Sequence, residues 1–63
     1  MTLKDLVYKV TLNVTITLWD NFGNVIGEGN PQQIIDYQSD YLSKEVRSIS
    51  VEDGHRMFIT LRG

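Results

Sequence analysis

The sequence predicts a small α+β domain: a four-stranded antiparallel sheet in the order β-β-α-β-β, with one helix packed on one face. Apolar residues alternate with polar ones over residues 6–18, and again over 45–51 and 56–61, as in half-buried strands. Between these segments, residues 31–43 carry apolar side chains at helical spacing. With 63 residues, the chain is expected to form a single domain, 1–63.

The first strand is predicted from about Leu6. Every second residue of this segment is apolar: Leu6, Tyr8, Val10, Leu12, Val14, Ile16 and Leu18. The residues between them are rich in threonine, so one face of the strand is expected to be buried and the other polar. A short helix over residues 2–9 is the alternative, because Thr2 and Asp5 have the spacing of a capping box. The longer alternating run favours the strand.

A hairpin follows the first strand. Gly23 supplies the positive φ that a tight turn needs, and a three-residue loop of Asn21–Gly23 places Leu18 opposite Ile26. The second strand is expected over about residues 24–28, with Gly27 and Gly29 ending it.

The helix is predicted to begin at Pro31. Asn30 is a suitable N-cap, and Gln33 can complete a capping box with it. Helical spacing is followed by Ile34, Tyr37, Gln38, Tyr41 and Leu42, with Ile35 beside them, which gives a stripe of Ile, Tyr and Leu side chains. We expect the helix to end near Ser43 and to dock on the sheet through this stripe. If the sheet covers this face of the helix only in part, Tyr37 and Tyr41 are expected to contact a partner instead.

The last two strands form a second hairpin, over residues 45–51 and 56–61. A three-residue loop of residues 52–54 pairs Val51 with His55 and Ile49 with Met57. This register gathers the apolar side chains on one face, whereas a two-residue loop would divide them between both faces.

Composition restricts the possible functions. The chain has no cysteine and one histidine, so disulfides and thiolate metal sites are excluded. Without such devices a chain of this size is expected to gain stability as a homo-oligomer. The net charge of −2 argues against a dedicated duplex-DNA binder. The chain has no apolar run long enough for a membrane span and no signal peptide, so we expect a cytoplasmic protein.

Two aromatic residues, Trp19 and Phe58, fall on the polar parity of their strands. They share that parity with Thr15, Thr17, Arg56 and Arg62. Each aromatic ring could be covered by its own chain. Alternatively, the second sheet face is open and contacts another subunit or partner, since aromatics and arginine are enriched at interfaces. The same combination suits stacking on single-stranded nucleic acid.

Carboxylates occur in both predicted turns. Local turn capping explains them most simply. If both turns lay at the same end of the sheet, their oxygens could bind a divalent cation such as Mg²⁺. Asp20 is then the first candidate for metal-dependent DNA nicking. The spacing matches no calcium loop, so no metal site or other cofactor is assigned, and His55 is expected to be an exposed turn residue.

The run from Val14 to Leu61 resembles short proteins of phages and prophages of Gram-positive bacteria. The resemblance rests on the segment 14–20, the Gly23 turn, Glu28-Gly29 before the helix, and 45–49 with the following hairpin. Some such proteins look like anti-CRISPR or other counter-defence factors. One group of these has an oligomeric sheet similar to single-stranded-DNA-binding coactivators, which would make Asp20 its acidic residue of interest.

The resemblance implies a counter-defence protein that acts in the bacterial host as a homo-oligomer on DNA or on a nucleic-acid enzyme. The alternative is an acidic inhibitor of a DNA-repair enzyme, similar to the phage inhibitor of uracil-DNA glycosylase. This chain departs from that inhibitor in its long second hairpin and milder charge. Self-contained small-molecule catalysis is not expected, and DNA nicking through Asp20 is the one catalytic activity considered.

Overall fold

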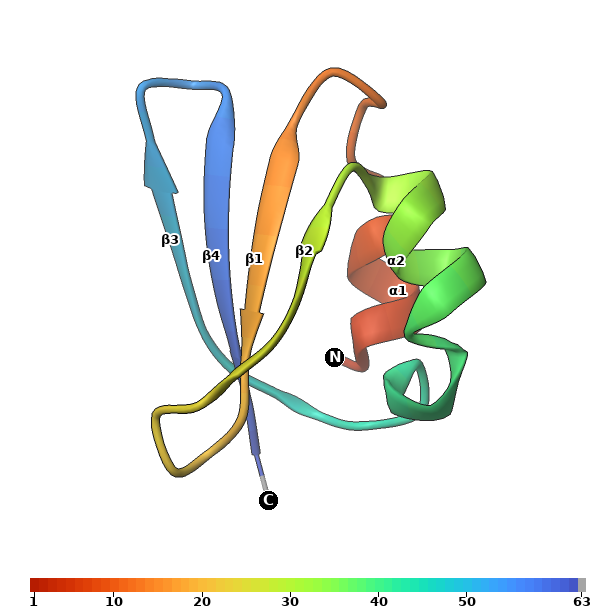
Figure 1. Cartoon of the computed structure of the whole chain (residues 1–63), viewed down its shortest axis with the longest axis vertical. Helices are drawn as coiled ribbons and strands as arrows, with labels where there is room; N and C mark the ends of the chain where they lie inside the picture. Colours follow the sequence, from red (N-terminus) through yellow and green to blue (C-terminus); the bar gives the residue numbers. More distant parts are fainter. Residues whose placement is uncertain (63) are drawn as a thin grey trace.

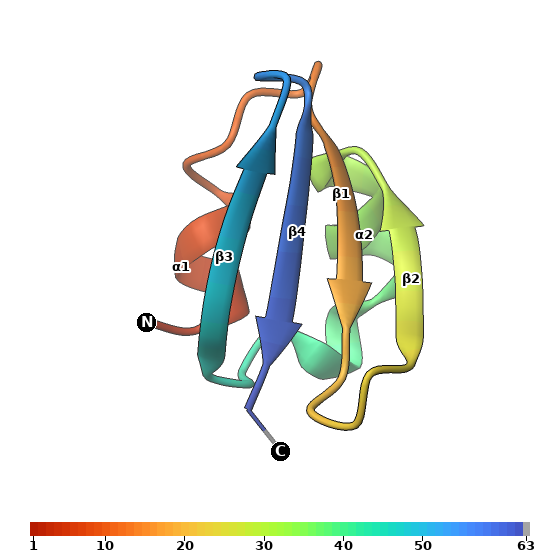
Figure 2. The same cartoon turned by 90° about the vertical axis from the view of Figure 1, so that its left-hand side faces the viewer.

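The computed structural model describes residues 1–62 and has a small α+β fold (Figure 1). Its elements are α1 (Leu3–Val7), β1 (Thr15–Trp19), β2 (Val25–Gly29), α2 (Pro31–Tyr37), the short 3-10 helix η1 (Ser39–Tyr41), β3 (Val46–Glu52) and β4 (Arg56–Leu61). Both α-helices lie on the same side of a four-stranded sheet, and the other side of the sheet faces outward (Figure 2).

The sheet is mixed, with the strand order β2-β1-β4-β3. Each hairpin is antiparallel, but β1 and β4 meet in the centre as a parallel pair. The prediction of a fully antiparallel sheet is therefore wrong. After β2, α2 returns the chain to the end of the sheet where β2 began, so β3 runs in the direction of β2 and β4 in that of β1 (Figure 1).

The chain begins with a helix, so the predicted element order is wrong at its start. Thr2 Oγ1 accepts a bond from the Asp5 N–H, and Asp5 Oδ2 accepts one from the Thr2 N–H, which completes a capping box. Leu3 and Val7 are buried in the core. The alternating apolar residues over 8–14 lie in a connecting loop and not in a strand. Tyr8 and Leu12 are exposed there, so their alternation does not bury them.

The first hairpin has the predicted loop but an additional bulge. The Asp20 N–H donates to the Asn24 carbonyl at 2.9 Å, and Trp19 pairs with Val25. The register then shifts, so Leu18 faces Gly27 rather than Ile26. Gly27 lies within β2 and does not end it. A Cβ atom there would lie 2.5 Å from Gln38 Nε2, so the glycine allows the segment after α2 to approach the sheet closely.

The second hairpin keeps the predicted face but not the predicted loop. Ile49 pairs with Ile59 and Val51 with Met57, two residues further along β4 than expected. A shift of two preserves side-chain parity, so the apolar residues still share a face. The loop begins one residue later because Asp53 takes a positive φ of 58°, which aspartate tolerates, followed by Gly54 at 70°.

Helix α2 begins as predicted and ends early. Asn30 and Gln33 form the expected capping box, with Pro31 in the first turn. The helix stops at Tyr37 rather than near Ser43, because Gln38 leaves helical geometry with φ −118° and ψ 33°. Tyr37 is exposed and does not dock the helix, whereas Ile34 is buried. The buried apolar core comprises Leu3, Val7, Ile16, Leu18, Ile34, Ile59 and Leu61.

Candidate binding face

The sheet face opposite the helices is the candidate functional surface, and we call it the open face (Figure 2). Residues paired across neighbouring strands project to the same side of a sheet, so the register defines which residues form it. The open face comprises Thr15, Thr17 and Trp19 on β1, Val25 and Glu28 on β2, Ser48, Ser50 and Glu52 on β3, and Arg56, Phe58 and Thr60 on β4.

Trp19 and Phe58 lie on the two central strands of this face. Trp19 is in register with Thr60, and Phe58 with Thr17, so the two rings occupy diagonal positions across the parallel β1–β4 pair. Both side chains are half-buried by their sheet neighbours. The sequence separated them by almost forty positions, and only the meeting of β1 with β4 brings them together.

Small hydroxylated side chains surround the two aromatics. Thr17 is almost buried, and its Oγ1 donates a bond of 2.9 Å to Glu28 Oε2 on β2. Ser50 lies opposite Phe58 on the other side. The cross-strand neighbours of Phe58 are therefore short on both sides, whereas Trp19 has Thr60 on one side and Val25 on the other.

The open face carries charges of both signs at its margins. Arg56 begins β4 and is in register with Glu52, and Arg62 follows the end of β4. Within residues 1–62 the ion pair found joins the N-terminal ammonium of Met1 to Glu45, so no side-chain carboxylate oxygen of these residues lies within 4.0 Å of Arg56 or Arg62. The two arginines lie at opposite ends of β4, and no side chain of the described residues neutralises their charge in an ion pair.

Asp20 stabilises the turn that follows β1. Its Oδ1 accepts bonds from the N–H groups of Phe22 at 2.8 Å and Asn24 at 2.9 Å, and its Oδ2 accepts one from Asn24 Nδ2 at 3.2 Å. The Asn24 N–H is the main reason why the pKa of the Asp20 carboxyl is lowered. All three bonds stay within the turn, so they assign Asp20 a local structural role.

The two hairpin turns lie at opposite ends of the sheet, because β1 and β4 are parallel (Figure 1). The condition for a shared metal site, that both turns lie at the same end, is therefore not met. In the described part of the chain, no three acidic, histidine or cysteine side chains come together as metal ligands do. DNA nicking through Asp20 stays a prediction, best tested with Asp20→Asn, which retains an oxygen acceptor for the turn.

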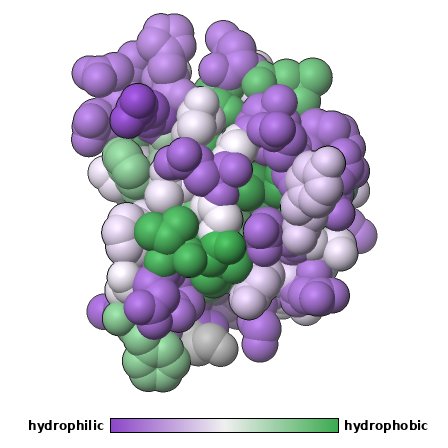
Figure 3. All heavy atoms as spheres, in the orientation of Figure 1, coloured by the Kyte–Doolittle hydropathy of each residue, from purple (hydrophilic) through white to green (hydrophobic). Residues whose placement is uncertain are grey.

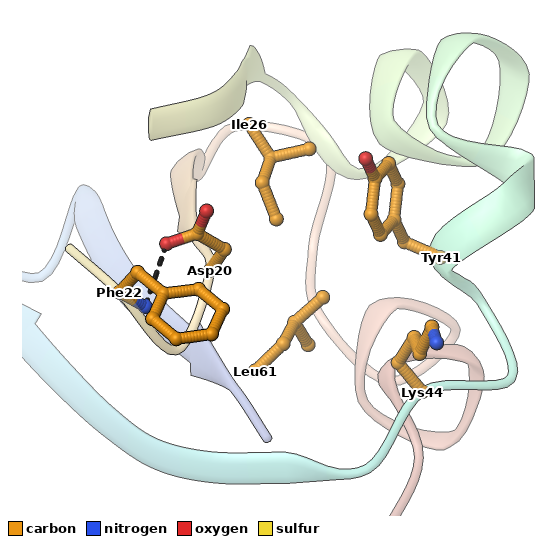
Figure 4. A pocket seen from close by; sticks show the side chains of 6 residues that line it. All are labelled: Asp20, Phe22, Ile26, Tyr41, Lys44 and Leu61. Atoms are coloured by element: carbon orange, nitrogen blue, oxygen red, sulfur yellow. Dashed lines mark hydrogen bonds between the residues drawn. The ribbon is translucent and has the colours of Figure 1, made fainter. Parts of the chain in front are cut away.

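A pocket of about 230 Å³ lies beside Asp20, on the helix side (Figure 4). Its lining residues are Asp20, Phe22, Ile26, Tyr41, Lys44 and Leu61. The volume is below the usual range for small-molecule sites. In the orientation of Figure 1, a patch of hydrophobic residues is exposed just below the centre of the surface (Figure 3). Sequence reasoning missed this pocket because its walls come from separate segments without a shared motif.

The predicted binding residues therefore divide between the open face and the helix side of the sheet. Thr15, Thr17, Trp19, Arg56 and Phe58 share the open face, with Arg62 just beyond it. The two predicted tyrosines do not belong to this face: Tyr41 lines the pocket, and Tyr37 projects from α2 with 79% of its surface exposed.

Comparison with protein-family models, curated proteins and solved structures found no match. Within residues 1–62, none of the helices is long and apolar enough to cross a membrane.

Proposed function

We propose that this chain binds single-stranded nucleic acid on the open face and serves as a phage-type counter-defence protein. One observation carries the binding proposal: Trp19 and Phe58 lie diagonally across the two central strands, on the face that no helix covers. Aromatic residues on an exposed sheet are a common platform on which unpaired bases stack.

The surroundings of the two rings support this ligand class. Among residues 1–62, Arg56 and Arg62 have no side-chain carboxylate contact, and they lie near opposite ends of β4, where they can contact phosphates several nucleotides apart. Thr17 and Thr60 are short and leave the ring faces accessible. Since two arginines supply the positive charge, log K is expected to fall with log salt at a slope of only about −1.4, or −0.7 per phosphate neutralised.

The binding test uses Trp19, which is the only tryptophan of the chain. Titration with an oligothymidylate should quench its fluorescence in a saturable way, because a stacked base quenches indole emission. Phe58→Ala should weaken binding, whereas Phe22→Ala should not, although Phe22 is the more exposed ring, in the β1–β2 turn. Absence of quenching, or equal weakening by both variants, would argue against the open face as the site.

The counter-defence role is supported by the resemblance to short phage proteins and needs its own test. Plaque formation by a targeted phage on a CRISPR-immune bacterium should rise when the chain is expressed. Phe58→Ala should remove the rise if the open face is responsible. Unchanged plaque numbers at confirmed expression would contradict the biological role while leaving nucleic-acid binding to be decided by the titration.

A further inference from the structure

The outer edge of β3 is largely unpaired. β3 is the last strand of the sheet and bonds to β4 on one side. On its other side the N-terminal segment covers only its start: the Val46 N–H donates to the Met1 carbonyl, and Thr2 bridges Glu45. From Arg47 to Glu52, the described residues place no backbone partner on this edge. Such an edge is a template for another strand.

The same stretch carries exposed aliphatic side chains. Ile49 and Val51 pair with Ile59 and Met57, so they belong to the helix-covered face. Nevertheless they are 40% and 62% exposed, because the helices do not extend over this part of β3. Exposed β-branched side chains beside an unpaired edge favour strand addition, since the added strand buries them.

We propose that a second copy of this chain pairs with the edge of β3 in antiparallel orientation, with the two-fold axis at Ser50. This register places Ile49 opposite Val51 of the second copy, and the reverse, so two aliphatic cross-strand pairs form. It also places Ser48 opposite Glu52 of the second copy. All pairs join residues of the same sheet face, as continuous pleating requires.

Charge complementarity identifies the second copy as the occupant. Arg47 lies at the start of the free stretch, while Glu52 and Asp53 lie at its end. Antiparallel pairing brings the positive end of one strand next to the negative end of the other, and two-fold symmetry forms this contact twice. In the monomer, Arg47 donates a bond of 3.0 Å to Asn21 Oδ1 in the exposed β1–β2 turn, which lies on the β4 side of β3, so dimerisation exchanges this exposed bond for the contact with the partner strand.

The opposite edge of the sheet is less suited to pairing. β2 has five residues, two of them glycine, and a bulge interrupts its register beside Trp19. Short, bulged edge strands resist strand addition. Its exposed apolar residue, Val25, therefore offers a matched control for Val51, with 54% of its surface exposed compared with 62%.

Dimerisation through β3 would join two four-stranded sheets into one of eight strands with a continuous open face. This inference does not depend on the proposed nucleic-acid binding, because the β3 edge and the aromatic pair are separate surfaces. If both hold, a dimer presents two Trp19–Phe58 pairs on one platform, and a longer oligonucleotide gains affinity by contacting both.

The first experiment is sedimentation velocity of the full chain over a wide micromolar range. The wild type should show a dimer whose population rises with concentration. Val51→Lys should weaken dimerisation about tenfold or more by removing both aliphatic pairs and placing charges at the edge. Val25→Lys should sediment like the wild type. A monomeric wild type, or equal effects of both variants, would overturn the proposal.

The second experiment tests the register through charge reversal. Arg47→Glu and Glu52→Arg should each weaken self-association, because each gives positions 47 and 52, which meet at both ends of the paired strands, charges of the same sign. Mixed in equal amounts, the two variants should form a heterodimer in preference to either homodimer, since positions 47 and 52 then carry opposite charges at both ends and Asp53 is the same in both variants. No recovery in the mixture would exclude this register. Circular dichroism tests whether both variants are folded. Because Glu52 lies on the open face in register with Arg56, oligonucleotide quenching is scored separately with Val51→Lys, which changes a residue of the helix-covered face.

Discussion

The two faces of the sheet use the same strands for different purposes. On the helix-covered face, Ile16, Leu18, Ile59 and Leu61 are almost completely buried and form the core. On the open face, the intervening positions of β1 and β4 carry threonines, arginines and two half-buried aromatics. Because side chains alternate along a strand, one parity provides stability and the other remains available for binding.

The largest expected effect comes from adjacent residues of β4. Ile59→Ala should lower the free energy of unfolding by about 2–5 kcal/mol, because it leaves a cavity in the core. Phe58→Ala should cause a smaller loss, since that ring is only half-buried. Urea denaturation followed by circular dichroism compares the two variants. Equal losses would indicate that the open face is packed as tightly as the core, and the division between faces would fail.

The second effect concerns binding rather than stability. Trp19→Ala should weaken oligothymidylate binding by about 1–3 kcal/mol, the usual value for one lost stacking contact. Tyr37→Ala is the control, because Tyr37 is the exposed aromatic of the helix layer. Anisotropy of a labelled oligonucleotide gives both affinities. Equal affinities for the two variants would move the binding site away from the open face.

A third, smaller effect is expected at the start of α2. Asn30→Ala should destabilise the chain by about 1 kcal/mol, because its side chain caps the Gln33 N–H at 2.8 Å. Asn30→Asp keeps an oxygen acceptor and should unfold close to the wild type. Thermal melts of the three proteins measure the difference. Oligonucleotide affinity of folded Asn30→Ala should remain unchanged, since α2 lies behind the sheet.

The smallest effect is a pH dependence of stability. The pKa of Asp20 is lowered mainly by the Asn24 N–H, and the pKa of Asp5 by the Thr2 N–H. A carboxyl whose folded-state pKa is depressed contributes stability above its unfolded-state pKa and loses it as pH falls through the folded-state value. Melting temperature should therefore decrease below about pH 4. Asp20→Asn should flatten this decrease, and an unchanged acid profile would contradict the role of the turn carboxylate.

Local chemistry made several features predictable from the sequence. The Asn30–Gln33 capping box and the Asn21–Gly23 loop depend on bonds that span three or four residues. The alternation of side chains also predicted that Met57, Ile59 and Ile49 share one face of the sheet. This prediction is confirmed although the predicted register differs from the observed one by two residues, because a shift of two keeps each side chain on the same face. The sequence predicted that Trp19 and Phe58 both alternate with the apolar residues of their strands. It did not predict that the two rings lie close together, because this depends on the pairing of β1 with β4.

The sequence by itself determined which side chains alternate, where two of the turns and caps form, and that Trp19 and Phe58 lie outside the apolar parity. Only the tertiary structure decided that residues 3–7 are helical, that α2 stops at Tyr37, and that β1 and β4 pair in parallel. Alternation and helical spacing overlap at the N-terminus, and burial selects between them: Leu3 and Val7 reach the core only as a helix. Strand order likewise depends on contacts between distant segments, which no local pattern encodes.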